Sequence, residues 1–281
     1  MPTETETPVK EAATLEEMVN RQLGRRAFLK LTGLGVFTAA AGSLPAVLEA
    51  ATPKLRTKRR YGMVIDLKRC VNCKACTIAC KLENKTPPGV VYNPVIEEEI
   101  GEYPYVQRRW FPKPCFHCDN PPCTGVCPVT ATCKRKEDGI VIVDYDKCIG
   151  CRYCITACPY GARYFDFGEN YPAHTTAYGQ VPSPEFQGEY GLRREGRSPV
   201  GNVRKCTFCL HLQDADGQYT RPPACSETCM AKAIHFGDFS SESNGGCITH
   251  EGCNLKQLLV EHRWIRLKEE LGTEPSVYYT L

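Results

Sequence analysis

The sequence has little excess charge and lacks the usual signatures of a catalytic or nucleic-acid-binding protein. Its 281 residues carry a formal net charge of only +3. No run of lysine and arginine is interleaved with aromatic residues, which argues against nucleic acid as a partner. The chain also has no glycine-rich phosphate loop, no pairing of a nucleophile with a base and no ligand pattern that leaves a metal position open. We therefore expect any substrate chemistry to take place on another protein.

Long apolar runs are also scarce, and the one notable uncharged stretch lies near the N-terminus. It covers residues 31–48, is rich in Gly, Ala and Thr, and follows Arg25 and Arg26. A membrane-spanning helix is usually longer and more apolar, although this stretch reaches the lower limit of that length. The pattern resembles a twin-arginine export signal, with small residues for cleavage in Leu48-Glu49-Ala50-Ala51. We interpret residues 1–50 as a signal region and expect a periplasmic protein; an uncleaved anchor and an ordinary amphipathic helix are the alternatives.

Cysteine, in contrast, is abundant, with 19 residues. Metal binding contributes to the folding free energy, so a protein that binds a redox metal has a reason to fold around it before export. The twin-arginine route permits this, because it carries folded protein. The cysteine density and the export signal therefore both indicate metal. Sixteen of the cysteines fall into four groups, numbered here one to four along the chain: Cys70, Cys73, Cys76 and Cys80; Cys115, Cys118, Cys123 and Cys127; Cys148, Cys151, Cys154 and Cys158; and Cys206, Cys209, Cys225 and Cys229.

The spacing within these groups is typical of iron–sulfur ligation. Groups one and three have the spacing Cys-x2-Cys-x2-Cys-x3-Cys, which is the bacterial ferredoxin run for [4Fe–4S] clusters. Their flanks repeat as well, because residues 63–80 and 141–158 align without a gap, each with a predicted strand, a ligand loop and a helical turn. Groups two and four share a Cys-x2-Cys, a Pro-Pro pair before the third cysteine and an x3 step to the fourth. Zinc knuckles and a disulfide framework fit this pattern less well.

The fourth cysteine of each group is predicted to serve a different cluster from the first three. In two-cluster ferredoxins the fourth cysteine of a run ligates the other cluster. Groups two and three are separated by only 20 residues, so they form one pair, and by elimination groups one and four form the other. The predicted ligand sets are Cys70, Cys73, Cys76 and Cys229 for cluster A; Cys80, Cys206, Cys209 and Cys225 for cluster B; Cys115, Cys118, Cys123 and Cys158 for cluster C; and Cys127, Cys148, Cys151 and Cys154 for cluster D.

From about Tyr61 onward the chain resembles the four-cluster iron–sulfur subunits of membrane-associated molybdoenzyme complexes, such as tetrathionate, polysulfide and dimethyl sulfoxide reductases. The resemblance rests on the sixteen cysteines and on CFHCDNPPCTGVCPVTAT, DGIVIVDYDKCIGCRYCITACPYGAR and KCTFC. It implies four [4Fe–4S] clusters, because Cys151 stands where members with a [3Fe–4S] cluster carry Trp. It also implies a molybdopterin-type catalytic partner and a polytopic quinone-reactive membrane subunit. Lys81 and Met230 depart from the proline that commonly follows the fourth ligand.

We therefore predict an α+β protein with two interleaved ferredoxin-like halves. Residues 61–112 with 203–240 would hold groups one and four, and residues 113–166 groups two and three; 167–202 would be a loop insertion and 241–281 a C-terminal helix and tail. The predicted function is to relay single electrons between a catalytic and a membrane subunit. The alternatives are a molybdenum-free sulfur-oxidation or hydrogenase-type complex and a metal-stabilised binding module without a redox role.

Three cysteines lie outside the groups. Cys133 is expected to be a small buried side chain beside a cluster. Cys247 and Cys253, in CITHEGC, are expected to form a disulfide in an exported chain, with free thiols or a metal site that includes His250 as the alternatives.

The basic residues and histidines near the cysteine groups, and the C-terminal tail, are assigned no role in metal binding. Lys74, Arg152 and Lys205 lie within the ligand loops and are interpreted as solvated surface charges rather than as groups that raise a cluster potential. His117 and His211 are expected to form hydrogen bonds or lie on the surface. In the tail, residues 255–271 have the apolar spacing of an amphipathic helix that Gly272 can end, and residues 275–281 are expected to lie extended against the body or a partner.

Overall fold

The computed structural model describes residues 59–168, 200–240 and 245–281. The predicted signal region, residues 1–50, and most of the predicted insertion lie outside these ranges. The described residues contain both helices and strands, as expected of an α+β protein, and fall within one compact unit, residues 56–281. Among the described helices, none has the length and apolar character needed to cross a lipid bilayer.

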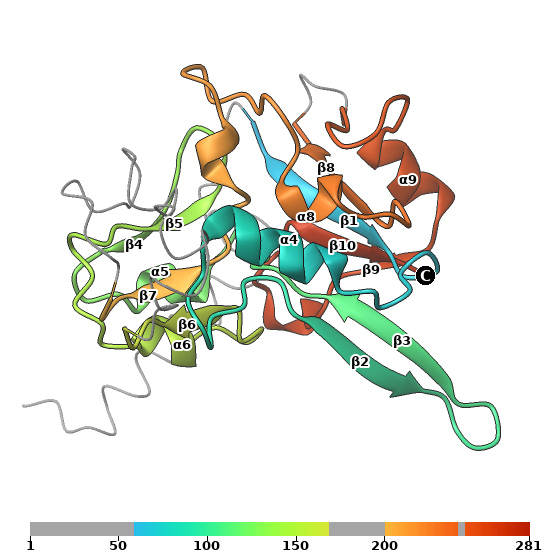
Figure 1. The fold of residues 1–281 in the computed structure, drawn as a ribbon, viewed down its shortest axis with the longest axis horizontal. Helices are drawn as coiled ribbons and strands as arrows, with labels where there is room; N and C mark the ends of the chain where they lie inside the picture. Colours follow the sequence, from blue (N-terminus) through green and yellow to red (C-terminus); the bar gives the residue numbers. More distant parts are fainter. Residues whose placement is uncertain (1–58, 169–199, 241–244) are drawn as a thin grey trace, which may run out of the picture. The chain divides into compact units, whose positions relative to one another are not determined.

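The largest sheet brings the first and last described strands together (Figure 1). Its strand order is β8–β1–β10–β9, in which β1 pairs antiparallel with β8 and parallel with β10, and β10 pairs antiparallel with β9. The predicted extended stretch at residues 275–281 therefore lies against the body, at the centre of the sheet. The strand bounds are Tyr61–Asp66 for β1, Ile234–Asp238 for β8, Trp264–Ile265 for β9 and Val277–Thr280 for β10.

Both faces of this sheet are covered. Residues alternate between the two faces along each strand, so neighbouring residues of β1 pack in different apolar clusters. Met63 and Ile65 of β1 belong to the main apolar core, which also contains many of the grouped cysteines. Val64, between them, packs on the opposite face with Leu255 of helix α9, Leu255–Glu261. Asn254 caps α9 by accepting hydrogen bonds from two backbone N–H groups of its first turn.

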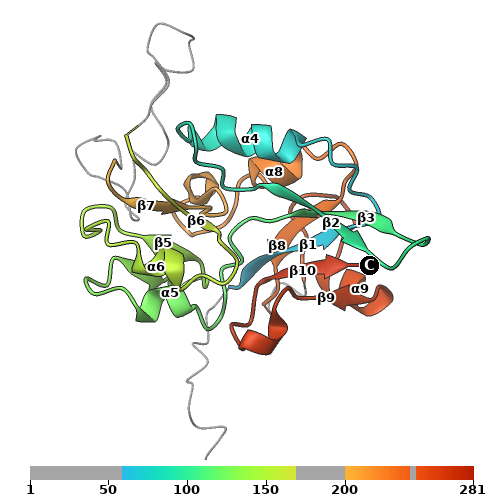
Figure 2. The same cartoon turned by 90° about the horizontal axis from the view of Figure 1, so that it is seen from below.

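Three two-stranded sheets accompany the large one: β2 with β3, β4 with β5, and β6 with β7. The strand β7 falls in a stretch predicted to lie with groups one and four, whereas the structure pairs it with β6 beside group three. Two of the helices, α4 and α8, lie side by side in both ribbon views (Figure 2). The strand bounds are Val95–Ile100 for β2, Gln107–Pro112 for β3, Thr132–Lys134 for β4, Val141–Val143 for β5, Arg163–Phe165 for β6 and Val203–Lys205 for β7. The helix bounds are Ala75–Asn84 for α4, Pro122–Gly125 for α5, Tyr153–Thr156 for α6, Ala224–Glu227 for α8 and Leu210–Leu212 for the 3-10 helix η2.

The sequence repeat corresponds to a repeat in strand pairing. In the large sheet, residues 63–65 of β1 pair antiparallel with residues 236–234 of β8. In the small sheet, residues 141–143 of β5 pair antiparallel with residues 134–132 of β4. The second pairing has the same register as the first, shifted by 78 residues on one strand and by 102 on the other. Each pair of strands is accompanied by a pair of helices, α4 with α8 and α5 with α6.

The predicted C-terminal helix is shorter than expected. The helix α9 ends at Glu261, ten residues before the predicted end. Backbone pairing explains the difference, because Trp264 and Ile265 form β9 against the edge of β10. A single 3-10 turn, η3 at Glu269–Leu271, follows and ends at Gly272, whose φ of 63° is in the left-handed region.

The ligand loops of groups one and three repeat the same unusual backbone conformation. Asn72 and Lys74 have φ values of 55° and 58°, and their counterparts Gly150 and Arg152 have 71° and 65°. At Gly150 the loop also passes close to the backbone, because a Cβ atom there would lie 2.3 Å from the carbonyl oxygen of Gly201. Asn72 carries a side chain in the equivalent position, so the two loops differ in how closely they are packed.

We predict that Gly150→Ala destabilises the protein and that Asn72→Gly does not. In Gly150→Ala the new Cβ would collide with the backbone, and alanine would have to adopt a left-handed conformation at a cost of roughly 1–3 kcal/mol. In Asn72→Gly, glycine instead relieves the strain of the left-handed conformation at position 72. The measurement is the midpoint of anaerobic thermal unfolding for both variants and the parent chain. Equal midpoints for Gly150→Ala and the parent would show that the contact with Gly201 does not constrain this loop.

Candidate metal centres

The first three cysteines of group one line a cavity together with the last cysteine of group four. Cys70 and Cys73 lie in the loop between β1 and α4, Cys76 lies in the first turn of α4, and Cys229 lies just after α8. The side-by-side packing of α4 and α8 explains how thiols so distant in the sequence meet. Burial raises the pKa of Cys76 to about 11, and the charge of Cys229 raises it further.

A second cavity is lined by the first three cysteines of group two and the last cysteine of group three. These are Cys115, Cys118, Cys123 and Cys158. Burial raises the pKa of Cys118 to about 12, with contributions from the other three thiols. Segments 115–123 and 158–163 thus share one cavity, as segments 70–76 and 229 share the other.

The fourth cysteine of group one lies among the first three of group four. Cys80, Cys206, Cys209 and Cys225 are all buried. Burial raises the pKa of Cys80 well above its usual value, and the charges of the other three thiols raise it further. The amide Nδ2 of Asn84 lies 3.5 Å from the sulfur of Cys80 and 3.7 Å from that of Cys209, so one donor serves two thiols from different groups.

The remaining four thiols form a partly exposed set, as do those of Cys70, Cys73, Cys76 and Cys229. Cys154 is buried, Cys127 and Cys148 are half-buried and Cys151 is exposed. Burial raises the pKa of Cys127, but hydrogen bonds from Thr132, Val129 and Ala131 outweigh this and the net pKa is lowered. Thr132 also hydrogen-bonds to Cys154, which connects the fourth cysteine of group two with group three.

The chemistry of these four sets requires positive charge. Burial and neighbouring thiols raise the pKa of most of their members, so the thiols would stay protonated without a cation. Iron bound to sulfur supplies that charge and deprotonates its ligands. Backbone N–H groups also donate to thiols, from Phe208 to the sulfur of Cys206 at 3.4 Å and from Asn72 to Cys70, and hydrogen bonds to sulfur are found around iron–sulfur centres. The residues present therefore fit thiolate-bound clusters.

Two buried cations accompany the thiols. Arg163 is 3 % exposed, and its Nη2 donates to the sulfur of Cys123 at 3.0 Å. Burial lowers the pKa of Arg163, but the charges of Cys123 and Cys154 outweigh it and the net pKa is raised. Lys205 is 1 % exposed and donates to the carbonyl oxygen of Cys206. The interpretation of Lys205 as a surface charge was therefore wrong, because pairing of β7 with β6 places it in the interior.

The other basic loop residues follow the prediction, whereas one cysteine does not. Lys74 and Arg152 are exposed, and Arg152 also stacks over Phe165 with its guanidinium carbon 4.3 Å from the ring centroid. Cys133 is exposed rather than buried, because it is the middle residue of β4 and faces away from its buried neighbour Thr132.

The two histidines make hydrogen bonds, as expected. His117 is buried and its Nδ1 accepts from the backbone N–H of Val141 at 3.0 Å. His211 lies 2.8 Å from a carboxylate oxygen of Glu83. Sequence reasoning gave no role to Arg163 or Asn84. The available signal was position, since Asn84 lies one helical turn after Cys80 and Arg163 begins the strand that follows group three.

Comparison with known proteins agrees with this geometry. Two models described as "4Fe-4S dicluster domain" match residues 106–173 and 140–230. A selenate reductase subunit of Mesobacillus selenatarsenatis is 51% identical over 220 residues, which are 77% of this chain and 70% of that protein. A tetrathionate reductase subunit of Salmonella typhimurium is 36% identical over 271 residues, 93% of this chain and 89% of that protein.

A third relative has the same character. The putative dimethyl sulfoxide reductase iron-sulfur subunit of Halobacterium salinarum is 38% identical over 232 residues, which are 78% of each chain. Cysteine spacing, convergent thiols and these relatives agree with one another, and they confirm the resemblance drawn from the sequence. The chain belongs to the family of ferredoxin-type [4Fe–4S] iron–sulfur (beta) subunits of molybdoenzyme complexes.

Proposed function

We propose that this chain relays single electrons between a molybdopterin-type catalytic subunit and a quinone-reactive membrane subunit, through four [4Fe–4S] clusters. Such clusters, when bound, accept and release one electron at a time. The observation that carries the proposal is that thiols of different groups converge, with Cys229 beside group one and Cys158 beside group two. Membership of the family and the absence of catalytic motifs in the sequence support a relay rather than a catalyst.

The proposed ligand sets are those of clusters A to D given above. The shared cavities support sets A and C, the mutual pKa effects of four buried thiols support set B, and the contacts of Thr132 support set D. The repeated strand register supports two interleaved ferredoxin-like halves, one around β1 and β8 and one around β4 and β5.

The sets follow one another in a line. Sets A and B are joined by one turn of α4, between Cys76 and Cys80. Sets B and C are adjacent at Cys206 and Cys115. Burial raises the pKa of Cys206, Lys205 opposes this, and the charge of Cys115 raises the pKa further. Sets C and D exchange their fourth cysteines. The order A–B–C–D is therefore the path that we propose for the electron.

The ends of this line are exposed and its middle is buried. Set B has only buried thiols, whereas Cys73 in set A and Cys151 in set D are exposed. Each exposed cysteine has an exposed apolar neighbour at the equivalent loop position, Val71 at 63 % and Ile149 at 64 %. Such rims suit contact with other proteins, because apolar side chains become buried there. Two exposed ends match two partner subunits.

The relay is tested on anaerobically purified full-length protein. We expect on the order of sixteen irons per chain and visible absorption that a strong reductant bleaches. Zinc in place of iron, with no reducible absorption, would instead identify a metal-stabilised binding module. Pull-down of the natively expressed complex should recover a molybdenum-containing subunit; recovery of a complex without molybdenum would support the sulfur-oxidation or hydrogenase-type alternative.

The crossed ligation is tested with three single variants. Cys158→Ala and Cys118→Ala should weaken the same electron-spin-resonance signal, because both remove a ligand of cluster C. Cys151→Ala should affect a different one, that of cluster D. Circular dichroism serves as the folding control, because loss of a cluster also removes folding free energy. If the Cys158 and Cys151 variants lose one shared signal while that of Cys118 persists, each run binds its own cluster and the exchange is wrong.

We also propose export of the folded chain to the periplasm, from the sequence of residues 1–50 alone. Replacing Arg25 and Arg26 with Lys should retain folded, iron-loaded protein in the cytoplasm. The measurement is the distribution of the protein between cytoplasmic and periplasmic fractions, with Lys30→Arg as a matched control. Normal export of the twin-lysine variant would exclude the twin-arginine route.

A further inference from the structure

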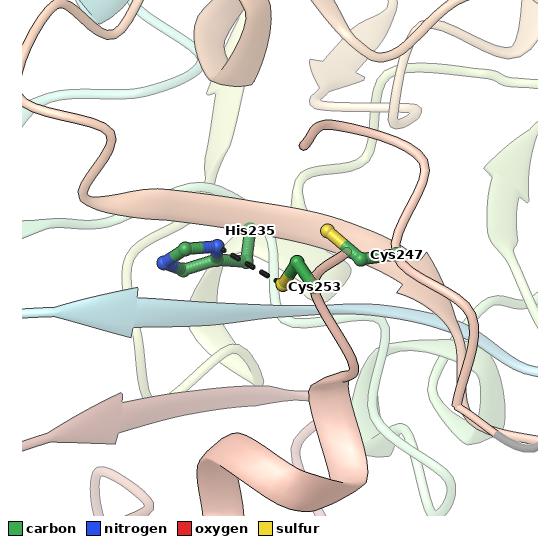
Figure 3. Close-up of side chains that lie close together, drawn as sticks. All are labelled: His235, Cys247 and Cys253. Atoms are coloured by element: carbon green, nitrogen blue, oxygen red, sulfur yellow. Dashed lines mark hydrogen bonds between the residues drawn. The ribbon is translucent and has the colours of Figure 1, made fainter. Parts of the chain in front are cut away.

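A separate cluster of metal-ligating side chains lies away from the four cysteine groups. It consists of His235 on β8 and Cys247 and Cys253 in the loop that precedes α9 (Figure 3). One ring nitrogen and the two sulfurs all lie within 4.8 Å of one another. His235 pairs with Val64 in the sheet and faces the side that α9 covers. The sequence placed the two cysteines together but paired them with His250 rather than His235.

The distances between these donor atoms fit a metal site. Both thiols are free in the structure. The sulfur of Cys253 lies 3.4 Å from Nδ1 of His235, and Figure 3 shows the sulfur of Cys247 on the same side of the strand. Tetrahedral zinc, with bonds of about 2.3 Å to sulfur and about 2.0–2.1 Å to nitrogen, places its donor atoms roughly 3.5–3.8 Å apart. The three donors therefore need only small movements to surround one ion.

His250 can supply a fourth donor. Its ring packs edge-on against that of His235, with centroids 5.1 Å apart and an angle of 83° between the planes. The Nε2 atom of His250 is buried and has no hydrogen-bond partner among the described residues. A buried nitrogen without a partner is costly, and a nearby metal ion would satisfy it. His250 also lies on the same loop as the two cysteines, between them in the sequence.

We propose that Cys247, Cys253, His235 and His250 bind one zinc ion in a closed, structural site. Two thiolates and two imidazoles form a common structural zinc set, and borderline-soft zinc suits this mixture better than oxygen-preferring cations. The site is distinct from the sixteen thiols proposed for iron, so it does not depend on the electron relay.

The surrounding backbone is already arranged to hold such a site. The N–H of Ile248 donates to the carbonyl oxygen of Phe236 at 2.8 Å, and the N–H of Phe236 donates to the hydroxyl of Thr249 at 3.0 Å. These bonds hold the loop against β8 beside the strand position that carries His235. Zinc would fasten this loop, and α9 after it, to the large sheet.

The test measures zinc and iron in the same preparation, purified anaerobically without a polyhistidine tag. We expect about one zinc per chain in addition to the iron, and zinc-edge X-ray absorption that requires both sulfur and nitrogen neighbours at the distances above. No stoichiometric zinc, or zinc surrounded by four sulfurs as in a mismetallated cluster site, would overturn the proposal. A mass lower by two hydrogens, restored by reductant, would instead show a Cys247–Cys253 disulfide and overturn it.

Variants separate this site from the iron sites. Cys247→Ser/Cys253→Ser should lose the zinc while iron content and the electron-spin-resonance signals stay unchanged. His250→Ala should bind zinc at least tenfold more weakly in a competition with a chelator, because even the partners of metal ligands typically contribute that much. Cys133→Ser is the matched control, since it removes an exposed thiol that belongs to no set. Retention of zinc by the double serine variant would place the metal elsewhere and contradict the assignment.

Discussion

The structure depends on one electrostatic constraint: many thiols are buried close together, and their thiolate forms can coexist only with positive charge between them. Burial and neighbouring thiols raise the pKa of Cys118 and Cys206 to about 12 each. Side chains offset only part of this, through Arg163 at Cys123 and Lys205 beside Cys206. Iron must supply the rest, so the same ions that would carry electrons also make the interior stable.

The chain meets this constraint by using one local unit twice. A strand, a ligand loop with left-handed residues and a helix occur at β1 and α4 and again at β5 and α6, with matching register on the partner strands β8 and β4. Backbone N–H groups donate to thiols in these loops, as Asn72 does to Cys70. Helix α4 then carries Cys80 toward the thiols of group four. In the proposed ligand sets, spacing along the sequence therefore accounts both for how three thiols meet and for why the fourth is assigned to a different cluster.

Features that depend on local spacing in the sequence could be predicted from it, whereas features that depend on pairing between strands could not. The strands before groups one and three and the convergence of Cys229 with group one follow from the repeat and from ferredoxin-type ligation. The end of α9 could not be predicted in this way, because it depends on the pairing of Trp264 with Thr280 of β10 and not on the apolar spacing within the segment. Lys205 became interior through the pairing of β7 with β6. His235 could not be recognised as a candidate ligand from the sequence, because only the packing of a later loop against β8 brings Cys253 close to it.

The order in which these segments are synthesised bears on how the protein acquires metal. The proposed set A begins at Cys70 and would be completed only by Cys229, and β1 is flanked by β8 and by β10, the last described strand. The first cysteines to be synthesised therefore meet their partner thiol only after much later segments have been synthesised. The loop of the proposed zinc site also lies late in the chain, between β8 and β10. Cluster binding cannot be completed strand by strand as the chain emerges. It requires the whole core to assemble in one compartment, which is the condition that export of a folded protein satisfies.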